Sequence, residues 1–399
     1  MSRRRRTGLL PAALLAYHHV GYPALLWVWA RLGGSQANRA ATLAGAPGRR
    51  PAQITVHDDD LPPVAFVIAA HDEAAVIGEK VRNTAALRYP RELLRIVVAC
   101  DGCTDDTAAR ARAAGADLVL ELPRGGKMAA QHVAVEQLTE PIVAFSDANS
   151  RWEPEALHAL VDALAAPGTG YACGRVRFVQ GDDTGDNQEG VYWRYEMAMR
   201  ERESALASVT AGNGAIYAIR RAAYSAYRFD PVMGHDLAMP FQLVRAGWRA
   251  VDVPSARATE KMVPTIGGEW SRKRRMMSHA WPIVLRAGLL DLRGLPGRYA
   301  VMLVSHRWLR YAGPLLHLWL AGASLLGARR SPLARLLVAG QLVVLALAVR
   351  PEQLPGGPLR RAGLIARYYV ATTAAIAFGL RDYLIDGTEA AWTPPEGTR

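Results

Sequence analysis

Cysteine is scarce in this chain of 399 residues, which contains only Cys100, Cys103 and Cys173. So small and odd a number excludes a disulfide framework. A zinc or redox site at the C-x-x-C pair would need further ligands, so we interpret all three thiols as packing residues. The chain also lacks a G-x-G-x-x-G fingerprint and a G-x-x-x-x-G-K-[ST] phosphate loop. These absences argue against a dinucleotide-dependent oxidoreductase and against a P-loop protein.

Acidic residues are outnumbered: 36 Asp and Glu stand against 48 Lys and Arg, for a net charge of +12. Such an excess suits nucleic acid, an anionic membrane surface or an anionic substrate. Basic residues cluster beside apolar stretches, at positions 3–6, 272–275, 329–330 and 360–361. Clusters in such places contact lipid headgroups. We therefore expect membrane lipid as a partner and no nucleic acid.

Four stretches are long and nearly free of charge: 8–32, 308–328, 333–349 and about 363–380. About 20 apolar residues suffice for a helix to cross a bilayer. The three C-terminal stretches predict about three transmembrane helices, with buried core helices as the alternative. The first stretch predicts a kinked span, a hairpin or an interfacial helix, and its pattern is not that of a cleavable signal peptide.

Residues 62–255 have a different pattern, in which short apolar runs alternate with helical segments. The runs are at 64–70, 93–100, 118–122 and 142–145, and the helical segments at 73–87, 105–114 and 128–138. This alternation is typical of βαβ units, so we expect an α/β fold with a mostly parallel sheet and flanking helices.

Polar residues follow three of these runs: His71 and Glu73 the first, Asp101 the second, and Asp147 and Asn149 the fourth. The carboxyl ends of parallel strands meet at one edge, where ligands bind. Acidic groups gathered there repel an anion unless a cation bridges them. The pattern therefore predicts a divalent metal, Mg²⁺ or Mn²⁺, at Asp147 and Asn149 beside a diphosphate ligand.

Several motifs, taken together, resemble those of family 2 glycosyltransferases, which have the GT-A fold. The resemblance covers roughly residues 62–285, and the flanking apolar stretches resemble the membrane-embedded branch of cellulose, hyaluronan and poly-N-acetylglucosamine synthases. The motifs stand in the family's order. They are Val67-Ile68-Ala69-Ala70-His71-Asp72-Glu73, Asp101-Gly102-Cys103-Thr104-Asp105, Gly126-Lys127, Asp147-Ala148-Asn149, Gly212-Asn213-Gly214-Ala215, His235-Asp236 and Arg272-Lys273-Arg274-Arg275-Met276.

The resemblance implies a role for each matching position. The nucleobase and ribose would be held by His71, Glu73 and Asp101. The donor diphosphate, sugar and metal would be contacted by Lys127, Asp147 and Asn149. The leaving diphosphate would be stabilised by Arg272 and Arg275, and the general base would be Asp236. On the acceptor side would lie Gly212, Asn213 and Gly214, with Trp270 as the best candidate for a sugar-stacking ring.

The implied chemistry is coherent on its own terms. A positioned carboxylate can take the proton of an acceptor hydroxyl, and a metal with arginines can neutralise the leaving diphosphate. One base without a nucleophile predicts a single displacement that inverts the anomeric centre. We therefore expect hexosyl or N-acetylhexosaminyl transfer from a nucleotide sugar, with UDP-sugar favoured, to a saccharide or lipid-linked acceptor in cell-surface polysaccharide or glycolipid synthesis. The alternative is a non-catalytic membrane protein that binds nucleotide or anionic lipid.

This hypothesis divides the chain into three parts. Residues 1–50 form a membrane segment and linker, 51–285 a glycosyltransferase domain, and 286–399 an interfacial helix, about three transmembrane helices and a polar tail. Basic residues on both flanks of 8–32 give no clear orientation. Because nucleotide sugars are made in the cytoplasm, we expect an integral plasma-membrane protein with its catalytic domain on that side.

Three further expectations concern individual segments. Met276 stands where the synthases have an acceptor-contacting Trp, so a short chain or a single transfer to a lipid is as compatible as a long polymer. The segment 189–204 predicts an amphipathic helix with a solvated face on which Glu196 and Arg200 form an i,i+4 pair. The segment 280–293 predicts an interfacial helix, and His235 suits either packing or a supporting role beside Asp236.

Overall fold

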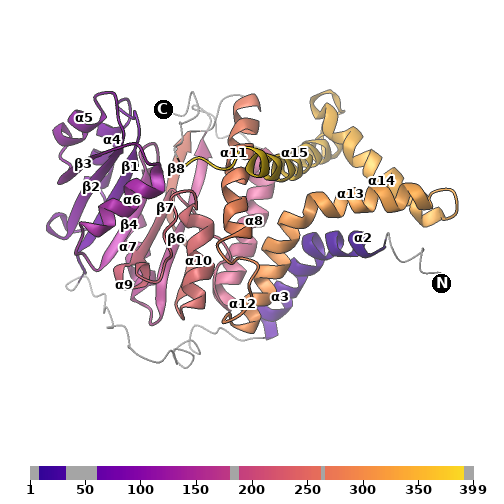
Figure 1. Ribbon diagram of the computed structural model, residues 1–399, viewed down its shortest axis with the longest axis horizontal. Coiled ribbons are helices and arrows are strands. Elements are labelled where there is room, and N and C mark those ends of the chain that lie inside the picture. Colours follow the sequence, from indigo (N-terminus) through magenta and orange to yellow (C-terminus); the bar gives the residue numbers. More distant parts are fainter. Residues whose placement is uncertain (1–8, 33–60, 180–187, 262–265, 391–399) are drawn as a thin grey trace.

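The computed structural model describes residues 9–32, 61–179, 188–261 and 266–390. A mixed α/β domain forms one side of the molecule, and long helices from both ends of the chain gather on the other (Figure 1). Between them stand α8 (Gln188–Leu206) and α11 (Ile266–Leu285), which run along the junction.

An eight-stranded sheet forms the centre of the α/β domain, in the order β3-β2-β1-β4-β7-β6-β8-β5. The strands β1 to β4 are mutually parallel where they pair, β7 is antiparallel to both β4 and β6, and β8 is parallel to β6. The strands are β1 Val64–Ala70, β2 Leu94–Asp101, β3 Leu118–Leu122, β4 Ile142–Asp147, β5 Arg151–Trp152, β6 Thr169–Val179, β7 Ile216–Arg220 and β8 Arg249–Lys261.

Helices cover both faces of the sheet, and each face has its own apolar core. Along β1, Ala65 and Val67 point into one core, while Phe66 and Ile68 point into the other. This alternation of period two, with both sides buried, explains why the strand is apolar throughout. The helices and 3₁₀ turn of this domain are α4 Ile77–Ala85, η5 Arg91–Leu93, α5 Thr107–Ala113, α6 Lys127–Glu136, α7 Ala156–Ala165, α9 Arg221–Tyr224 and α10 His235–Arg245.

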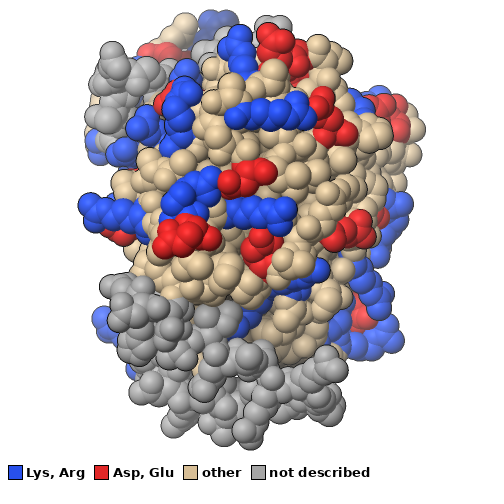
Figure 2. All heavy atoms as spheres, turned by 90° about the vertical axis from the view of Figure 1, so that its left-hand side faces the viewer, with Lys and Arg blue, Asp and Glu red and all other residues tan. Residues whose placement is uncertain are grey.

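The predicted fold class is confirmed, and the first four strands lie within a residue or two of the predicted runs. On the face formed by α5 and β3, basic and acidic side chains are interspersed (Figure 2), the pattern of an ordinary solvated surface. The strands β5 to β8, which form the second half of the sheet, were not predicted from the sequence.

Within the described part of the chain, three helical segments are long and apolar enough to cross a membrane: Leu9–Leu32, Pro332–Val349 (α14) and Pro358–Ile385 (α15). The predicted stretch 308–328 is helical as α13 (Leu309–Gly327) but is not among these three. The other elements of this part are α2 Leu9–Ala16, η1 Tyr17–Gly21, α3 Tyr22–Leu32, α12 Gly297–Met302, η6 Leu303–Trp308 and η7 Pro351–Gln353.

The N-terminal stretch is one helix with a π-helical turn at Tyr17–Gly21, which excludes the hairpin alternative. Pro23 has no N–H to donate to the carbonyl of His19, four residues earlier. That carbonyl oxygen instead accepts a hydrogen bond of 3.2 Å from the Tyr195 hydroxyl on α8. The proline thereby creates a link between this helix and the junction.

The predicted helix over 280–293 is wrong in its extent. Its first residues belong to α11, which ends at Leu285, and turns follow. Gly288 adopts a φ of 84°, a conformation that ends helices and that side chains with a Cβ rarely adopt. Residues 286–296 are therefore a connection to α12.

Candidate active site

A cavity of about 520 Å³ lies between the α/β domain and the helices α11 and α15. It opens beside the carboxyl ends of β1 and β4, as the strand pattern predicts. Most of the predicted site residues line it: Glu73, Lys127, Asp147, Asn149, Gly212, Asn213, Gly214, Asp236, Arg272 and Arg275. The fold thus brings together side chains that are up to 202 positions apart in the sequence.

Lys127 and Asp147 form an ion pair in this cavity. The Lys127 ammonium also donates to the carbonyl oxygen of Gly214 over 3.1 Å. Lys127 opens α6 directly after Gly126, whose φ of 92° favours glycine. The lysine is therefore fixed between Asp147 and the glycine loop at 212–214.

Asp101 and His71 lie behind the cavity wall and hold the loop that precedes Lys127. The buried Asp101 carboxylate accepts hydrogen bonds from the backbone N–H of Gly125 at 2.6 Å and of Gly126 at 2.9 Å. The ring of His71 forms a 2.7 Å hydrogen bond through Nδ1 with the Asp101 carbonyl. Contacts of His71, Glu73 and Asp101 with a nucleotide stay predictions.

Asp236 lies in the first turn of α10, where a carboxylate is favourable for the helix dipole. The Gly212 N–H donates to the Asp236 carbonyl oxygen over 2.6 Å. A Cβ placed on Gly214 would stand 3.9 Å from Asp236 Cβ and 3.9 Å from Lys127 Nζ. The candidate base and Lys127 therefore flank the same glycine.

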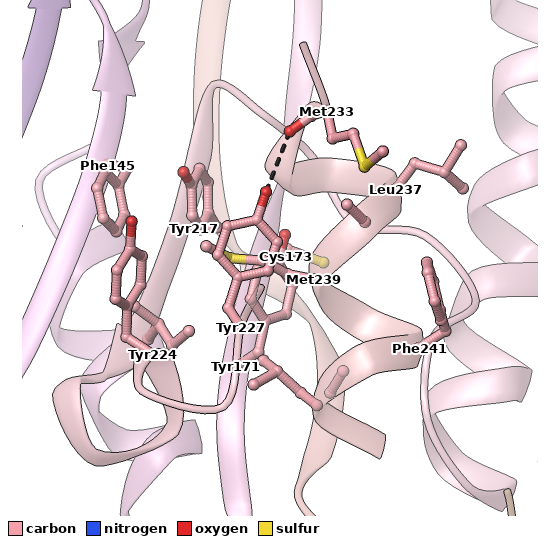
Figure 3. Packing of buried hydrophobic residues seen from close by; sticks show 14 of the residues in the cluster. Phe145, Tyr171, Cys173, Tyr217, Tyr224, Tyr227, Met233, Leu237, Met239 and Phe241 are labelled. Atoms are coloured by element: carbon pink, nitrogen blue, oxygen red, sulfur yellow. Dashed lines mark hydrogen bonds between the residues drawn. The ribbon is translucent and has the colours of Figure 1, made fainter. Parts of the chain in front are cut away.

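An aromatic core behind the cavity fixes α10 (Figure 3). The Tyr227 hydroxyl donates to the Met233 carbonyl, just before the helix, over 3.2 Å. His235 is fully buried, and its Nδ1 forms a 2.5 Å hydrogen bond with the Tyr217 hydroxyl. Burial, with smaller contributions from Lys127 and His132, lowers the pKa of His235 to about 3. His235 is thus a neutral packing residue, and its burial fixes the position of the adjacent Asp236.

Two further ionisable residues were missed by the sequence analysis. Glu260, near the end of β8, lines the cavity, and burial together with the nearby Asp147 charge raises the pKa of its carboxyl to about 7. Lys80 is buried under the cavity and donates to the Ser150 carbonyl over 2.6 Å. Burial lowers the pKa of Lys80 to about 7, against the influence of Asp147 and Glu260. A signal existed for Lys80, which stands three residues after Ile77 and four before Thr84 on the buried side of α4.

The donor set around Asp147 suits a hard divalent cation. Asp147 and Glu260 are neighbouring carboxylates, and Asn149 lines the same cavity with an amide. Carboxylate and amide oxygens are the ligands that Mg²⁺ and Mn²⁺ take in such sites. Ligand atoms of Asp72, Cys103 and Asp105 also lie within 4.8 Å of one another. That second group already receives backbone N–H bonds from Thr104, Ala74 and Thr107, so it serves to fasten the loop.

The basic run on α11 is divided between two helix faces. Arg272 and Arg275, three residues apart, line the cavity. Arg274 pairs with Asp382 of α15 through contacts of 2.5 and 2.6 Å, and the Lys273 ammonium, which also borders the cavity, stands 3.6 Å from the centre of the Tyr368 ring. Trp270 packs edge-on against Phe378, at a ring distance of 5.9 Å, and is not among the described residues that line the cavity.

The expectation for α8 is wrong. Glu196 and Arg200 are both buried rather than solvated, and they do not pair with each other. The Glu196 carboxylate instead accepts hydrogen bonds from Arg307 at 3.3 Å and Arg310 at 3.1 Å, and it contacts His306. The charged face of this helix is covered by η6 and α13, which the local pattern of charges does not reveal.

A sequence model described as "Glycosyltransferase like family 2" matches residues 62–279, more than half of the chain. The chain belongs to this glycosyltransferase family. Its fold is GT-A-like, and a solved mannosyltransferase from Pyrobaculum calidifontis, in complex with GDP-Man and Mn²⁺, is similar over 95% of this chain and 99% of its own, with 23% identity and a TM-score of 0.68.

A weaker structural similarity is found to glucosyl-3-phosphoglycerate synthase from Mycobacterium tuberculosis, in complex with Mn²⁺, UDP and phosphoglyceric acid. It covers 59% of this chain and 84% of the other, with 21% identity and a TM-score of 0.43. Comparison with curated proteins gives no significant match. At 23% identity the similarity to the mannosyltransferase shows the fold alone. The substrates of this chain are therefore argued from the residues of its own cavity.

Proposed function

We propose that the protein is a membrane-bound, inverting glycosyltransferase that moves a sugar from a nucleotide-diphosphate sugar to a saccharide or lipid-linked acceptor. The observation that carries this proposal is the meeting of Lys127, Asp147 and Asp236 around Gly214 in one cavity that Arg272 and Arg275 also line. Cations for a leaving diphosphate and a carboxylate for a hydroxyl proton thus face a common space.

The reaction is then a single displacement. An acceptor oxygen forms a bond to the anomeric carbon, the bond from that carbon to the diphosphate breaks, and Asp236 takes the acceptor proton. Lys127, Arg272 and Arg275 hold the departing diphosphate. A divalent cation bound by Asp147 and Asn149, with Glu260 beside them, would add positive charge at the diphosphate. The relative from Pyrobaculum calidifontis, which was solved with GDP-Man and Mn²⁺, supports this donor class, and the base of the nucleotide stays a matter for experiment.

The membrane-embedded branch of the family and the cytoplasmic orientation of the catalytic domain belong to the same proposal. Support comes from the three apolar helices and from α15, which provides part of the cavity wall through Tyr368, Thr372 and Ala375. An acceptor that resides in the membrane would reach the cavity beside this helix.

The direct test is Asp236→Asn in the full chain, measured as sugar transfer from labelled UDP- and GDP-sugars in membranes. We expect transfer to fall by about 10² to 10⁴-fold, the usual contribution of a general base, with donor binding retained. Asp162→Asn, an exposed change on α7, is the matched control and should leave transfer unchanged. Full activity of the Asp236 variant would contradict the assignment, and donor binding without transfer in the unaltered protein would favour the non-catalytic alternative.

A further inference from the structure

Arg200 is a buried cation with no hydrogen-bond partner among the described residues. It is 4% exposed and lines the cavity from α8. Neither its Nε nor its Nη1 atom has a hydrogen-bond partner among the residues that the structure describes. A guanidinium cannot lose its proton in a protein, and an unpaired buried charge is costly. The side chain is therefore suited to a ligand that supplies negative charge.

Arg307 gives a second, independent indication. It is also 4% exposed and lines the same cavity. Its Nε donates to the Thr210 hydroxyl at 2.9 Å and its Nη1 to Glu196 at 3.3 Å. Its third nitrogen, Nη2, is buried without a partner among the described residues. Two arginines that line one cavity thus have N–H groups without partners among the described residues.

The nearby buried carboxylates do not supply a hydrogen bond to Arg200. Glu196 and Glu203 have other partners, and Asp252 interacts with Arg200 through its charge only, because its Oδ1 atom has no hydrogen-bond partner among the described residues. Glu196 is bonded by Arg307 and Arg310, and Glu203 by the ring of His306 at 2.7 Å. Asp252 directs its Oδ2 to Arg175 at 2.6 Å. The unpaired N–H groups of Arg200 and Arg307 remain, and an anion with several oxygens would accept hydrogen bonds from both arginines.

This pair of arginines lies on the acceptor side of the cavity. Arg307 contacts Thr210, and the N–H of Gly212, two residues further on, is bonded to Asp236. Two residues of extended chain span about 7 Å at most, so the arginine and the candidate base border the same short loop. Tyr368 and Thr372 of the apolar helix α15 line the same cavity.

We infer that Arg200 and Arg307 form an acceptor subsite for a phosphate group, so that the acceptor of the proposed transfer carries a phosphate monoester or diester. That the bound molecule is an acceptor rests on the proposed function. The phosphate-binding site itself is argued from the two arginines alone. A phosphorylated amphiphile and a small soluble phosphate share the chemistry that these side chains recognise, and the experiment separates them.

The test is a ligand titration of the purified full chain in a neutral detergent, followed by the thermal midpoint of unfolding. The probes are dodecyl phosphate, inorganic phosphate and dodecanol, with UDP or GDP in excess to fill the donor positions. We expect dodecyl phosphate to raise the midpoint by several degrees and dodecanol to leave it unchanged. A shift with inorganic phosphate at equal concentration indicates a soluble acceptor, and a shift with dodecyl phosphate alone indicates a lipid.

The decisive variant is Arg200→Leu. It should weaken the response to phosphate at least tenfold and, because it removes an unpaired buried charge, should raise the midpoint without ligand. A merely structural arginine would show the reverse, a lower midpoint. Arg307→Gln should also weaken the response, and the exposed Arg293→Gln, outside the cavity, should not. The inference is overturned if phosphate probes do not stabilise the protein or stabilise Arg200→Leu equally.

Failure of this inference and failure of the proposed function give different results. If the enzyme assignment is wrong, Asp236→Asn retains transfer while the phosphate response still depends on Arg200. If only the subsite is wrong, Asp236→Asn loses transfer while Arg200→Leu binds phosphate probes as the unaltered protein does.

Discussion

The backbone N–H of Gly212 donates a 2.6 Å hydrogen bond to the carbonyl oxygen of Asp236. This bond ties the glycine loop before β7 to the first turn of α10, two segments whose side chains would meet the acceptor. The position of the candidate base is therefore set by main-chain contacts as well as by the aromatic core beneath it.

The glycines of this loop provide a matched pair of substitutions. A Cβ on Gly212 would lie 2.0 Å from the buried hydroxyl of Tyr171, whereas a Cβ on Gly214 would meet atoms only at 3.9 Å. We expect Gly212→Ala to destabilise the fold by about 1 to 3 kcal/mol, the usual effect of overpacking, and Gly214→Ala to fold normally. Thermal midpoints of both variants check this. Equal midpoints would show that Tyr171 moves freely.

Removal of the Lys127 ammonium should change metal binding in a definite direction. The ammonium occupies the Asp147 carboxylate that a divalent cation would use. We expect Lys127→Gln to bind Mn²⁺ about threefold to tenfold more tightly without donor, and to lose transfer activity, because the proposed contact of the ammonium with the diphosphate is removed. Titration of Mn²⁺ followed by paramagnetic resonance measures the affinity. Asp147→Asn is the opposite control and should bind Mn²⁺ more weakly. An unchanged affinity in Lys127→Gln would place the ion elsewhere.

Asp101 should be needed for the integrity of the Lys127 loop. Its carboxylate accepts N–H bonds from Gly125 and Gly126 in a buried setting. Charge-assisted bonds of this kind contribute about 1.5 to 3 kcal/mol, so Asp101→Asn should lower both the thermal midpoint and transfer. A variant with unaltered stability and weaker nucleotide binding would instead indicate that Asp101 serves the ligand directly.

His235 should make the protein less stable in mild acid. Its folded-state pKa of about 3 lies below its ordinary value of 6.5, so the unfolded chain binds a proton first as the pH falls. The contribution of the neutral His235 ring to the free energy of unfolding is complete above about pH 6.5. Below that pH the free energy of unfolding decreases by about 1.4 kcal/mol per pH unit, until the folded-state pKa is reached. Thermal midpoints from pH 7 to pH 4 measure this slope. The slope should be smaller in His235→Gln, and parallel curves for the two proteins would contradict the assignment.

The first half of the sheet, β1 to β4, follows from local sequence pattern. The strands β1, β2 and β4 are short apolar runs whose two faces are both buried, and β3 is a short apolar run at the sheet edge, so hydrophobicity alone marks them. The strand β8 has no such mark, because it alternates irregularly between buried and exposed residues and includes polar ones along its length. Glu260 went unnoticed for this reason, although its carboxyl interacts with the Asp147 charge. Lys80 went unnoticed although its position on the buried side of α4 marks it.

The motifs of the sequence determined the family and the candidate residues of the cavity, since strand ends and glycine loops carry their chemistry at fixed spacing. Tertiary structure alone decided what surrounds the charges of α8. A helix sequence records which residues share a face, but whether water or other charged helices cover that face depends on segments more than a hundred positions away. For that reason Glu196 and Arg200, adjacent on one turn of helix, are buried against different neighbours rather than paired in solvent.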